Sequence, residues 1–566
     1  MIRSRHPRLA RAATALAAAA LAVALTACAG LPTSGPVKMG RAVADAAEDP
    51  TVFFNPADPA PGMSPQQIVD GFIAAATGPR NDWGTARLFL TEDFAARWQP
   101  AAGVTVYAPD QRTMAEPSEG EITVEIVPEA SVDATGAYSV VDAGPTTLAY
   151  RLEKVDGEWR IADAPDGIVL DRSRFASVFR SYALMYFDPT WTYLVPDQRW
   201  FAVENAATRI AQALVSGQPS PWLAGSVVTA FTEGAGLVGP SVPVRSQIAQ
   251  VSLRPAAREL EQITLDRMQA QLERSLETAR VQGVDMLVDG QLLEATAVEV
   301  ADTRIESRSL VLSGGTFGFL AGDVLDTIPG LSDAVVEAGA VAAEVDAERV
   351  NAAVRTTAGD VRRVRADGSS QILDERAGLI DPTIDASGFV YSVSSGSPTD
   401  VRAFGLDGTQ YDIAGAWPGA TAVDAMRVSR DGTRVAAIVR DSGRSRIVVA
   451  GIVRDQAGTP QRLSEPVELG PLPGDATGLG LTWLDGSTVA ALADEGAQQV
   501  VIEQPVGGPM EITRAPEGAV SIAGGNESGT VRVLDADGTL HGQRGAGWSP
   551  IASDVTFVAV QKGSPS

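Results

Sequence analysis

The chain has 566 residues, with 70 acidic and 45 basic side chains and a formal net charge of −25. A chain this acidic is poorly suited to binding nucleic acid, because phosphates are neutralised by Lys and Arg. One cysteine and two histidines exclude internal disulfides and the Cys or Cys/His sets of structural zinc sites. We therefore expect no metal, no cofactor and no nucleic-acid partner.

The N-terminus is typical of a secretory signal, predicted over residues 1–27. Arg3, Arg5, Arg8 and Arg11 form a basic head, and residues 12–27 are an apolar run that ends in small side chains. The run is shorter than the roughly 18 apolar residues of a membrane span. A transmembrane anchor is therefore the weaker interpretation.

The only cysteine, Cys28, follows this run directly. Leu25-Thr26-Ala27-Cys28 resembles the bacterial lipobox, which implies that the Cys28 thiol is acylated and that the chain is cut before it. The alternative is a plain signal peptide with an incidental cysteine. Cleavage would remove four arginines and no acidic residue, taking the formal charge from −25 to −29. Lipid, rather than surface charge, would then hold the protein on an anionic bilayer.

Two α+β units are predicted after a flexible, Pro/Gly/Ala/Asp-rich tether over residues 28–62. In residues 63–170, Ser64 and Pro65 predict a helix start, and Asp156-Gly157 predicts a hairpin. Helices followed by strands suggest a cone of the nuclear-transport-factor type. Such a cone can hold a ligand or serve as a plain structural module, and the second use is favoured.

The second unit is predicted over residues 190–305. Its long helix at 256–283 places Met268, Leu272 and Leu276 on one apolar face. Residues 192–203 are predicted as a strand, with or without a turn at Pro196-Asp197. The other expected elements are a helix at 205–217, strands at 225–233 and 246–254, and a strand pair around Asp289-Gly290.

A repeat in residues 310–563 predicts an all-β propeller. Its copies begin at Asp346, Asp385, Asp431 and Asp485, separated by 39, 46 and 54 residues. About five four-stranded blades are expected, with type I′ Asp-Gly turns between strands. Residues 554–560 are expected to pair with 309–314 and close the ring. A β-sandwich or an open meander is the alternative.

Three further patterns carry little functional weight. Residues 234–239 match G-x-G-x-x-G, but Pro240 and Pro243 follow where a nucleotide-binding helix should begin. Residues 535–538 suggest a calcium loop without its closing glutamate, so a hairpin is expected. His541, the only histidine after residue 27, is expected to be a surface residue rather than part of a catalytic triad.

The order of parts resembles the LpqB family of actinobacterial lipoproteins: a lipobox, an α+β module, a GerMN-like domain carrying residues 186–200 (YFDPTWTYLVPDQRW), and a propeller. The resemblance covers nearly the whole mature chain. It places the lipid, a palmitate-type acyl group, on Cys28 and carries over no catalytic residue. It implies an accessory protein on the extracytoplasmic face of the cell membrane, whose partner is the sensor histidine kinase MtrB of a two-component system in cell-wall homeostasis and division.

The sequence therefore predicts a multidomain protein of two α+β domains followed by an all-β propeller, acting as a non-enzymatic binding lipoprotein. Confinement to the membrane would raise the effective concentration of a membrane partner. The alternative function is a cell-envelope hydrolase that uses carboxylates of the propeller channel. A solute-binding lipoprotein is disfavoured, because the chain lacks the alternating βαβ pattern of two-lobed binding proteins.

Overall fold

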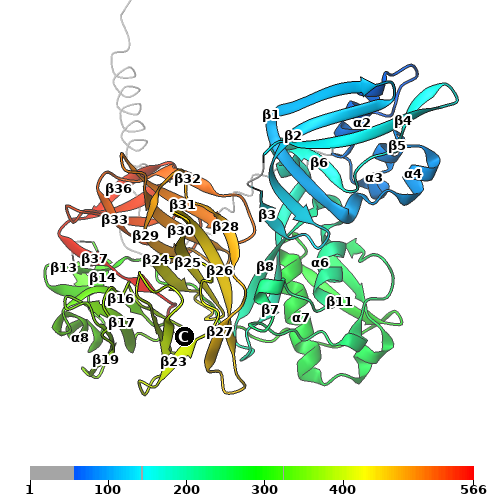
Figure 1. The fold of residues 1–566 in the computed structure, drawn as a ribbon. Helices are drawn as coiled ribbons and strands as arrows, with labels where there is room; N and C mark the ends of the chain where they lie inside the picture. The colour runs from blue at the N-terminus through cyan, green and yellow to red at the C-terminus, as the bar shows by residue number, and fades with distance from the viewer. Residues whose placement is uncertain (1–55, 142–143, 323, 566) are drawn as a thin grey trace, which may run out of the picture. The chain divides into compact units, whose positions relative to one another are not determined.

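The computed structural model describes residues 56–141, 144–322 and 324–565. In chain order these form two α+β domains and a strand-rich region of several four- and five-stranded sheets, which confirms the predicted fold class (Figure 1). We call them the first domain (α2 to α5), the second domain (β7 to β12) and the propeller (β13 to β38).

The first domain packs helices on one face of a mixed sheet with strand order β5-β4-β2-β1-β6, and β3 pairs with β2. All its strand pairs are antiparallel except β1–β6. Its helices are α2 (Pro65–Ala75), α3 (Arg80–Arg87), α4 (Glu92–Arg97), the 3₁₀ turn η1 (Pro100–Ala102) and α5 (Arg172–Val178). Its strands are β1 (Gly103–Ser118), β2 (Glu121–Asp133), β3 (Tyr138–Val140), β4 (Thr146–Val155), β5 (Glu158–Asp163) and β6 (Ile168–Asp171).

Two local predictions for this domain are confirmed. Ser64 caps α2 through a capping box with Gln67, which satisfies donors that would otherwise lack partners at the helix start. Asp156 and Gly157 both have positive φ, 52° and 87°, as a two-residue type I′ hairpin requires. The apolar face of α2 is buried against the sheet.

The second domain combines a two-stranded ribbon, β7–β8, with helices and a small four-stranded sheet of order β12-β11-β10-β9. β8 is continuous through Pro196, so no turn interrupts it. The predicted apolar face of α7 is buried, with Met268, Leu272 and Leu276 each 0% exposed. The elements are β7 (Phe179–Phe187), β8 (Leu194–Ala202), η2 (Val203–Asn205), α6 (Ala206–Val215), η3 (Pro221–Leu223), η4 (Glu233–Ala235), β9 (Val244–Arg245), β10 (Ile248–Ser252), η5 (Pro255–Glu259), α7 (Gln262–Glu277), β11 (Gly283–Val288) and β12 (Gln291–Leu292).

The strand predicted at residues 225–233 was wrong. This stretch forms turns and isolated bridges, such as the one between Val228 and Phe187. The reason is local: the Gln271 side chain on α7 accepts a hydrogen bond from the Ala230 backbone N–H at 2.7 Å. A side chain thus provides the partner that a neighbouring strand would have supplied.

The propeller has six blades in the part of the chain that the structure describes, one more than the sequence suggested. Each sheet has a central path of four strands, and each inner strand contacts the inner strand of a neighbouring blade. The blades, inner strand first, are β37-β13-β14-β15, β16-β17-β18-β19, β20-β21-β22-β23, β24-β25-β26-β27, β29-β30-β31-β32 and β33-β34-β35-β36, with β28 pairing with β26.

The first three blades are β37 (Val555–Val558), β13 (Leu310–Ser313), β14 (Thr316–Ala321), β15 (Val324–Asp326); β16 (Ala340–Val345), β17 (Asn351–Thr356), β18 (Val361–Arg365), β19 (Ser370–Asp374); and β20 (Thr383–Ile384), β21 (Val390–Ser392), β22 (Val401–Phe404), β23 (Gln410–Ile413). The helix α8 (Leu331–Glu337) lies between the first two blades in sequence. The other blades are β24 (Ala422–Val428), β25 (Arg434–Asp441), β26 (Arg444–Arg454), β27 (Pro460–Leu463), β28 (Val467–Pro471); β29 (Thr477–Trp483), β30 (Thr488–Asp494), β31 (Gln499–Pro505), β32 (Glu511–Arg514); and β33 (Ala519–Ala523), β34 (Arg532–Asp535), β35 (Leu540–Arg544), β36 (Gly547–Ala552).

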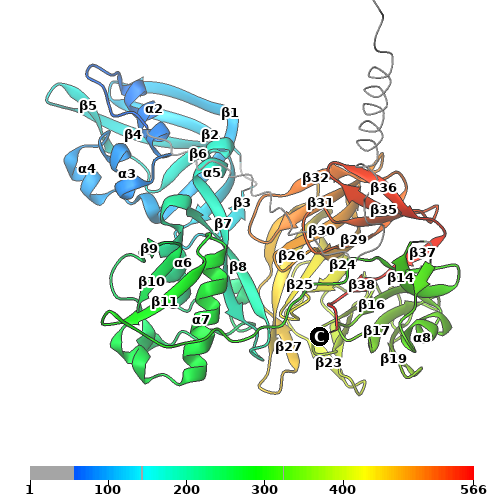
Figure 2. The same cartoon turned by 180° about the vertical axis from the view of Figure 1, so that it is seen from behind.

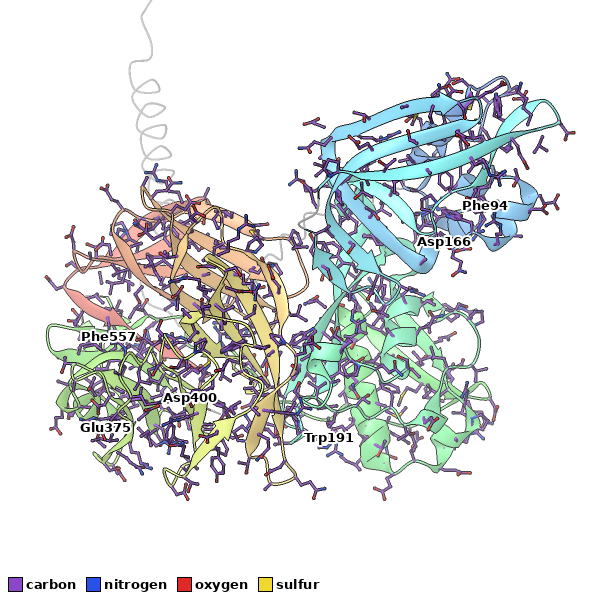
Figure 3. All side chains as sticks on the ribbon, in the orientation of Figure 1. Phe94, Asp166, Trp191, Glu375, Asp400 and Phe557 are labelled. Atoms are coloured by element: carbon purple, nitrogen blue, oxygen red, sulfur yellow. The ribbon has the colours of Figure 1, made fainter. Side chains whose placement is uncertain are left out.

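The first and last parts of the propeller segment close the ring as predicted. β37 pairs with β13 in antiparallel fashion, with Val558 opposite Val311, and β38 (Val560–Gln561) pairs with β16, as seen from behind in Figure 2. Phe557, labelled in Figure 3, packs against Phe317 of β14 with 5.9 Å between ring centroids and the rings tilted by 35°. The first blade therefore joins strands that lie more than 200 residues apart, which removes an exposed sheet edge.

The repeat marks the turn that enters the second strand of four blades. In each copy the aspartate accepts backbone hydrogen bonds, as Asp431 does from Thr433 at 2.9 Å. The predicted type I′ geometry was wrong for the Asp-Gly turns at 367–368, 407–408 and 431–432, where only the glycine has positive φ, and at 485–486, where neither residue has. There the aspartate caps the turn through its side chain instead.

Buried arginines join neighbouring blades. Arg363 of β18 is 0% exposed and donates to the carbonyl oxygens of Gly388 and Phe404 in the next blade, at 2.6 and 3.1 Å. Burial lowers the pKa of Arg363 to about 10, so the group is still charged at neutral pH. Its charge is solvated by main-chain carbonyls rather than by a carboxylate.

We expect Phe557→Ala to weaken closure of the propeller, because it removes the buried aromatic side chain that packs β37 against β14 in the first blade. The expected loss is about 3–5 kcal/mol of propeller stability. Hydrogen–deuterium exchange of β13 should accelerate. Thr556→Ala, on the exposed side of the same strand, is the matched control. Unchanged β13 exchange in the Phe557 variant would contradict this account of closure.

Candidate functional site

The strand β8 contacts all three domains. Side chains alternate between its two faces, so Gln198 and Trp200 point to the propeller, where they donate to Ser487 Oγ and to the Gly507 carbonyl oxygen, each at 2.8 Å. On the opposite face lie Asp197 and Arg199. The motif that carried the family resemblance is therefore a junction between domains.

Asp197 and Arg199 form a buried ion pair, 1% and 4% exposed, with 2.8 Å between Asp197 Oδ2 and Arg199 Nη2. Ser220 donates to Asp197 through its backbone N–H at 2.8 Å and its hydroxyl at 2.7 Å. Arg199 also donates to the carbonyl and hydroxyl oxygens of Thr135, in the first domain, at 3.0 and 2.7 Å. Desolvation alone would lower the pKa of Arg199, but Asp197 raises it above its usual value, so the guanidinium is charged.

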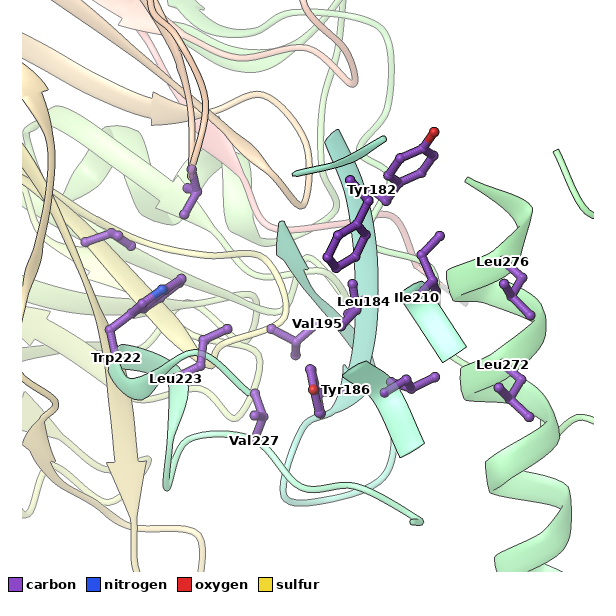
Figure 4. Close-up of a cluster of buried hydrophobic side chains, with 14 of the residues drawn as sticks. Tyr182, Leu184, Tyr186, Val195, Ile210, Trp222, Leu223, Val227, Leu272 and Leu276 are labelled. Atoms are coloured by element: carbon purple, nitrogen blue, oxygen red, sulfur yellow. The ribbon is translucent and has the colours of Figure 1, made fainter. Parts of the chain in front are cut away.

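A single apolar cluster continues from the second domain into the propeller. Figure 4 shows Trp222 and Leu223 on one side of the β7–β8 ribbon and Leu272 of α7 on the other. The same cluster includes Ile438, Ile447 and other side chains of the propeller strands β24 to β31. Ser464 of the propeller donates to the Trp222 carbonyl oxygen at 2.5 Å. This continuity makes independent motion of the two domains costly, since separation would expose the apolar side chains that meet here.

The centre of the propeller holds a buried charge pair. Lys562 Nζ lies 2.5 Å from Glu344 Oε1 and also donates to the Val428 carbonyl oxygen. Thr383 Oγ1 donates to Glu344 at 2.8 Å. Burial lowers the pKa of Lys562, and the carboxylate of Glu344 opposes this shift. The charge of the Glu344 carboxylate is therefore compensated by Lys562.

The segment that enters the propeller crosses the same end. Asn526 exchanges two 2.8 Å hydrogen bonds with the backbone of Ile305, and Arg430 donates to the Thr303 carbonyl oxygen at 3.4 Å. Arg532 donates to the Ser307 carbonyl oxygen. The linker and the C-terminal residues therefore pack on the propeller end that holds Glu344.

The predicted site residues do not gather in one place. Cys28 lies outside the described residues. His541, on β35, is half-buried, and its Nε2 lies 2.9 Å from Asp535 Oδ2. Residues 535–538 form the β34–β35 hairpin turn, and 234–239 form a loop after η4, as predicted. Among the described residues, no group of three or more His, Cys, Asp or Glu side chains could hold a metal ion.

No helix within the described ranges is long and apolar enough to cross a membrane. The sequence reasoning missed the junction on β8 and the central Glu344–Lys562 pair. The first had one usable signal, the charged residues Asp197 and Arg199 inside an otherwise apolar strand. The second had none, because residues 218 positions apart meet there only through ring closure.

Three family models match the chain. They are described as "Lipoprotein LpqB, N-terminal domain" over residues 58–176, "Sporulation and spore germination" over residues 183–294, and "Lipoprotein LpqB beta-propeller domain" over residues 315–557. Their order along the chain follows the first domain, the second domain and the propeller.

Curated relatives carry the same name. Lipoprotein LpqB of Thermobifida fusca is 33% identical over 51% of this chain and 48% of its own length, so that alignment spans about half of the relative. Lipoprotein LpqB of Bifidobacterium longum is 26% identical over 97% of this chain and 99% of its own length. Among solved structures, TolB from Acinetobacter baumannii has a TM-score of 0.34 and 14% identity, covering 44% of this chain and 65% of that one. With LpqB models matching at both ends and a relative aligned over nearly its whole length, the chain belongs to the LpqB family of lipoproteins.

Proposed function

We propose that this protein is a membrane-anchored, extracytoplasmic lipoprotein that binds and regulates the sensor kinase of a two-component system. The kinase is MtrB-like, and the process served is cell-wall homeostasis and division. Family membership supports the lipoprotein part of this proposal. The lipobox at Cys28 supports acylation as the anchor.

The observation that carries the proposal is the junction on β8. Polar contacts from both faces of one strand and a continuous apolar cluster join the second domain to the propeller. A unit joined in this way can present loops of two domains to one partner as a fixed surface. Fixed surfaces bind without the entropy cost of ordering separate parts.

The envelope-hydrolase alternative is less well supported. It needs a carboxylate that is free to act on a substrate from the propeller channel. Glu344, the buried carboxylate at the centre, is paired with Lys562 and hydrogen-bonded by Thr383. Lys562 and Thr383 hold Oε1 of this carboxylate, while its buried Oε2 lies 3.6 Å from Arg427 Nε without a hydrogen-bond partner. The two neighbouring cations support a structural role for Glu344, and the binding function is therefore preferred.

Cys28→Ala should abolish function while leaving the fold intact, because the thiol that would carry the acyl chains is lost. We expect the variant to leave the membrane fraction and to lose crosslinking to the kinase in its own cells. Its melting temperature should match that of the wild type. Replacing residues 1–28 of the variant with a single membrane-spanning helix should restore crosslinking. A fully active soluble variant would refute anchoring as a requirement.

Asp197→Asn should weaken the junction, because Arg199 would keep its buried charge without a counter-ion. Breaking a buried pair costs about 3–5 kcal/mol. Hydrogen exchange should rise at residues 133–137 and 485–488, and kinase crosslinking should fall. Asp289→Asn is the matched control, since the Asp289–Arg258 pair is exposed with 3.7 Å between its charged atoms and should contribute below about 1 kcal/mol. Equal behaviour of the two variants would show that the junction is dispensable.

A further inference from the structure

The first domain contains a pocket of about 380 Å³ that the proposed partner binding does not use. It opens between β1, α2 and the β6–α5 connection. Its polar lining consists of Asp70, Tyr107, Arg112, Asp171 and Arg174, and Met114 and Pro109 add apolar contacts. A volume of this size lies at the small end of the range for ligand sites.

An irregularity in β1 builds the pocket. Tyr107 pairs with Pro128 and Arg112 pairs with Ile126 on β2, so the four residues 108–111 stand opposite Val127 alone. Bulges of this kind redirect side chains and are frequent beside functional sites. On its other edge, Tyr107 is in register with Asp171 of β6. The bulge thus places Tyr107, Arg112 and Asp171 around one opening.

The hydroxyl of Tyr107 is unpartnered although its residue is only 3% exposed. The hydrogen bonds of the described residues include none to this hydroxyl, and it is not among the fully sealed polar atoms that lack a partner. The hydroxyl therefore faces the open space that Tyr107 lines. Buried tyrosine hydroxyls usually find a hydrogen-bond partner, so this one is available to a bound molecule.

The charged lining offers both signs. Arg112 bonds Asp70 through one of its guanidinium nitrogens, which leaves other N–H donors of the fork for a ligand. Arg174 Nε lies 3.3 Å from Asp171 Oδ2. Desolvation raises the pKa of Asp171, but hydrogen bonds from Ser173 and Arg174 outweigh this and hold the pKa below its usual value. The pocket therefore presents an ionised Asp171 beside guanidinium groups, with the Asp70 side chain also in its lining.

We propose that this pocket binds a small zwitterion, a molecule of amino-acid to dipeptide size with a free carboxylate and a free ammonium group. Arg112 and Arg174 would bind its carboxylate, Asp70 and Asp171 its ammonium, and the Tyr107 hydroxyl a polar group between them. Two carboxylates and two guanidinium groups around one small pocket match a ligand that carries both charges. Each guanidinium of the lining already pairs with one carboxylate, so a ligand with both charges can bind both members of a pair, whereas an anion or a cation alone can bind only one.

Calorimetric titration of the purified mature full-length protein in detergent tests this proposal. The probes are L-alanyl-L-alanine and D-alanyl-D-alanine, with the N-acetylated and C-amidated forms of each. We expect one dipeptide to saturate the protein below about 10 mM, a weak affinity on the usual scale. Loss of either terminal charge should weaken binding at least about tenfold. Absence of saturation by both dipeptides would overturn the proposal.

Variants locate the binding. Tyr107→Phe removes one oxygen and should weaken binding about 3–10-fold, and Arg112→Gln should remove the preference for a free carboxylate. Asp70→Asn is the substitute if another pocket variant fails to fold, because the Asp70 side chain is 57% exposed. Tyr411→Phe in the propeller is the matched control and should bind as the wild type does. Wild-type binding by all three pocket variants would also overturn the proposal. Neither membrane nor kinase enters the assay, so its failure would leave the anchoring and partner proposals intact.

Discussion

The buried pair between Asp197 and Arg199 is the interaction on which the contact between the first and second domains is centred. Two charges inside a protein are costly unless they are paired and hydrogen-bonded, and here Ser220 and Thr135 add hydrogen bonds from the second and first domains. The ion pair is therefore stable only while Ser220 and Thr135 keep their hydrogen bonds to it. On the other face of the same strand, Gln198 and Trp200 hold the propeller. Alternation along one β-strand thus links three domains.

The propeller depends on a second long-range constraint. Its ring closes only when β37 pairs with β13, and this closure brings Lys562 to Glu344 at the centre. The linker from the second domain crosses the same end and is bonded by Asn526, Arg430 and Arg532. The linker and the C-terminal residues of the propeller therefore meet at the end of the propeller that holds Glu344. The alternative function, a hydrolase, would need a catalytic carboxylate in this region.

Much of the fold follows from local patterns in the sequence. The capped helix at Ser64, the type I′ turn at Asp156-Gly157 and the apolar face of α7 were predicted because each depends on residues a few positions apart. The sequence repeat did not reveal the sixth blade, because the first blade takes its inner strand, β37, from a segment more than 200 residues further along the chain. The sequence also did not predict the pocket beside Tyr107, because a bulge at residues 108–111 leaves no periodic pattern of apolar residues. Cys28, the predicted lipidation site, lies outside the described residues and stays a prediction.

The shared apolar cluster and the contacts of β8 join the second domain and the propeller into one body. Pulsed electron resonance between spin labels at Ile263 and Ile512, both exposed at 45% and 47%, tests this claim most directly. Cys28 would be replaced by Ser, so that the two introduced cysteines are the only labelling sites. A single narrow distance distribution in solution is the predicted result. A broad distribution, or several peaks, would show that the domains move independently and would contradict the claim.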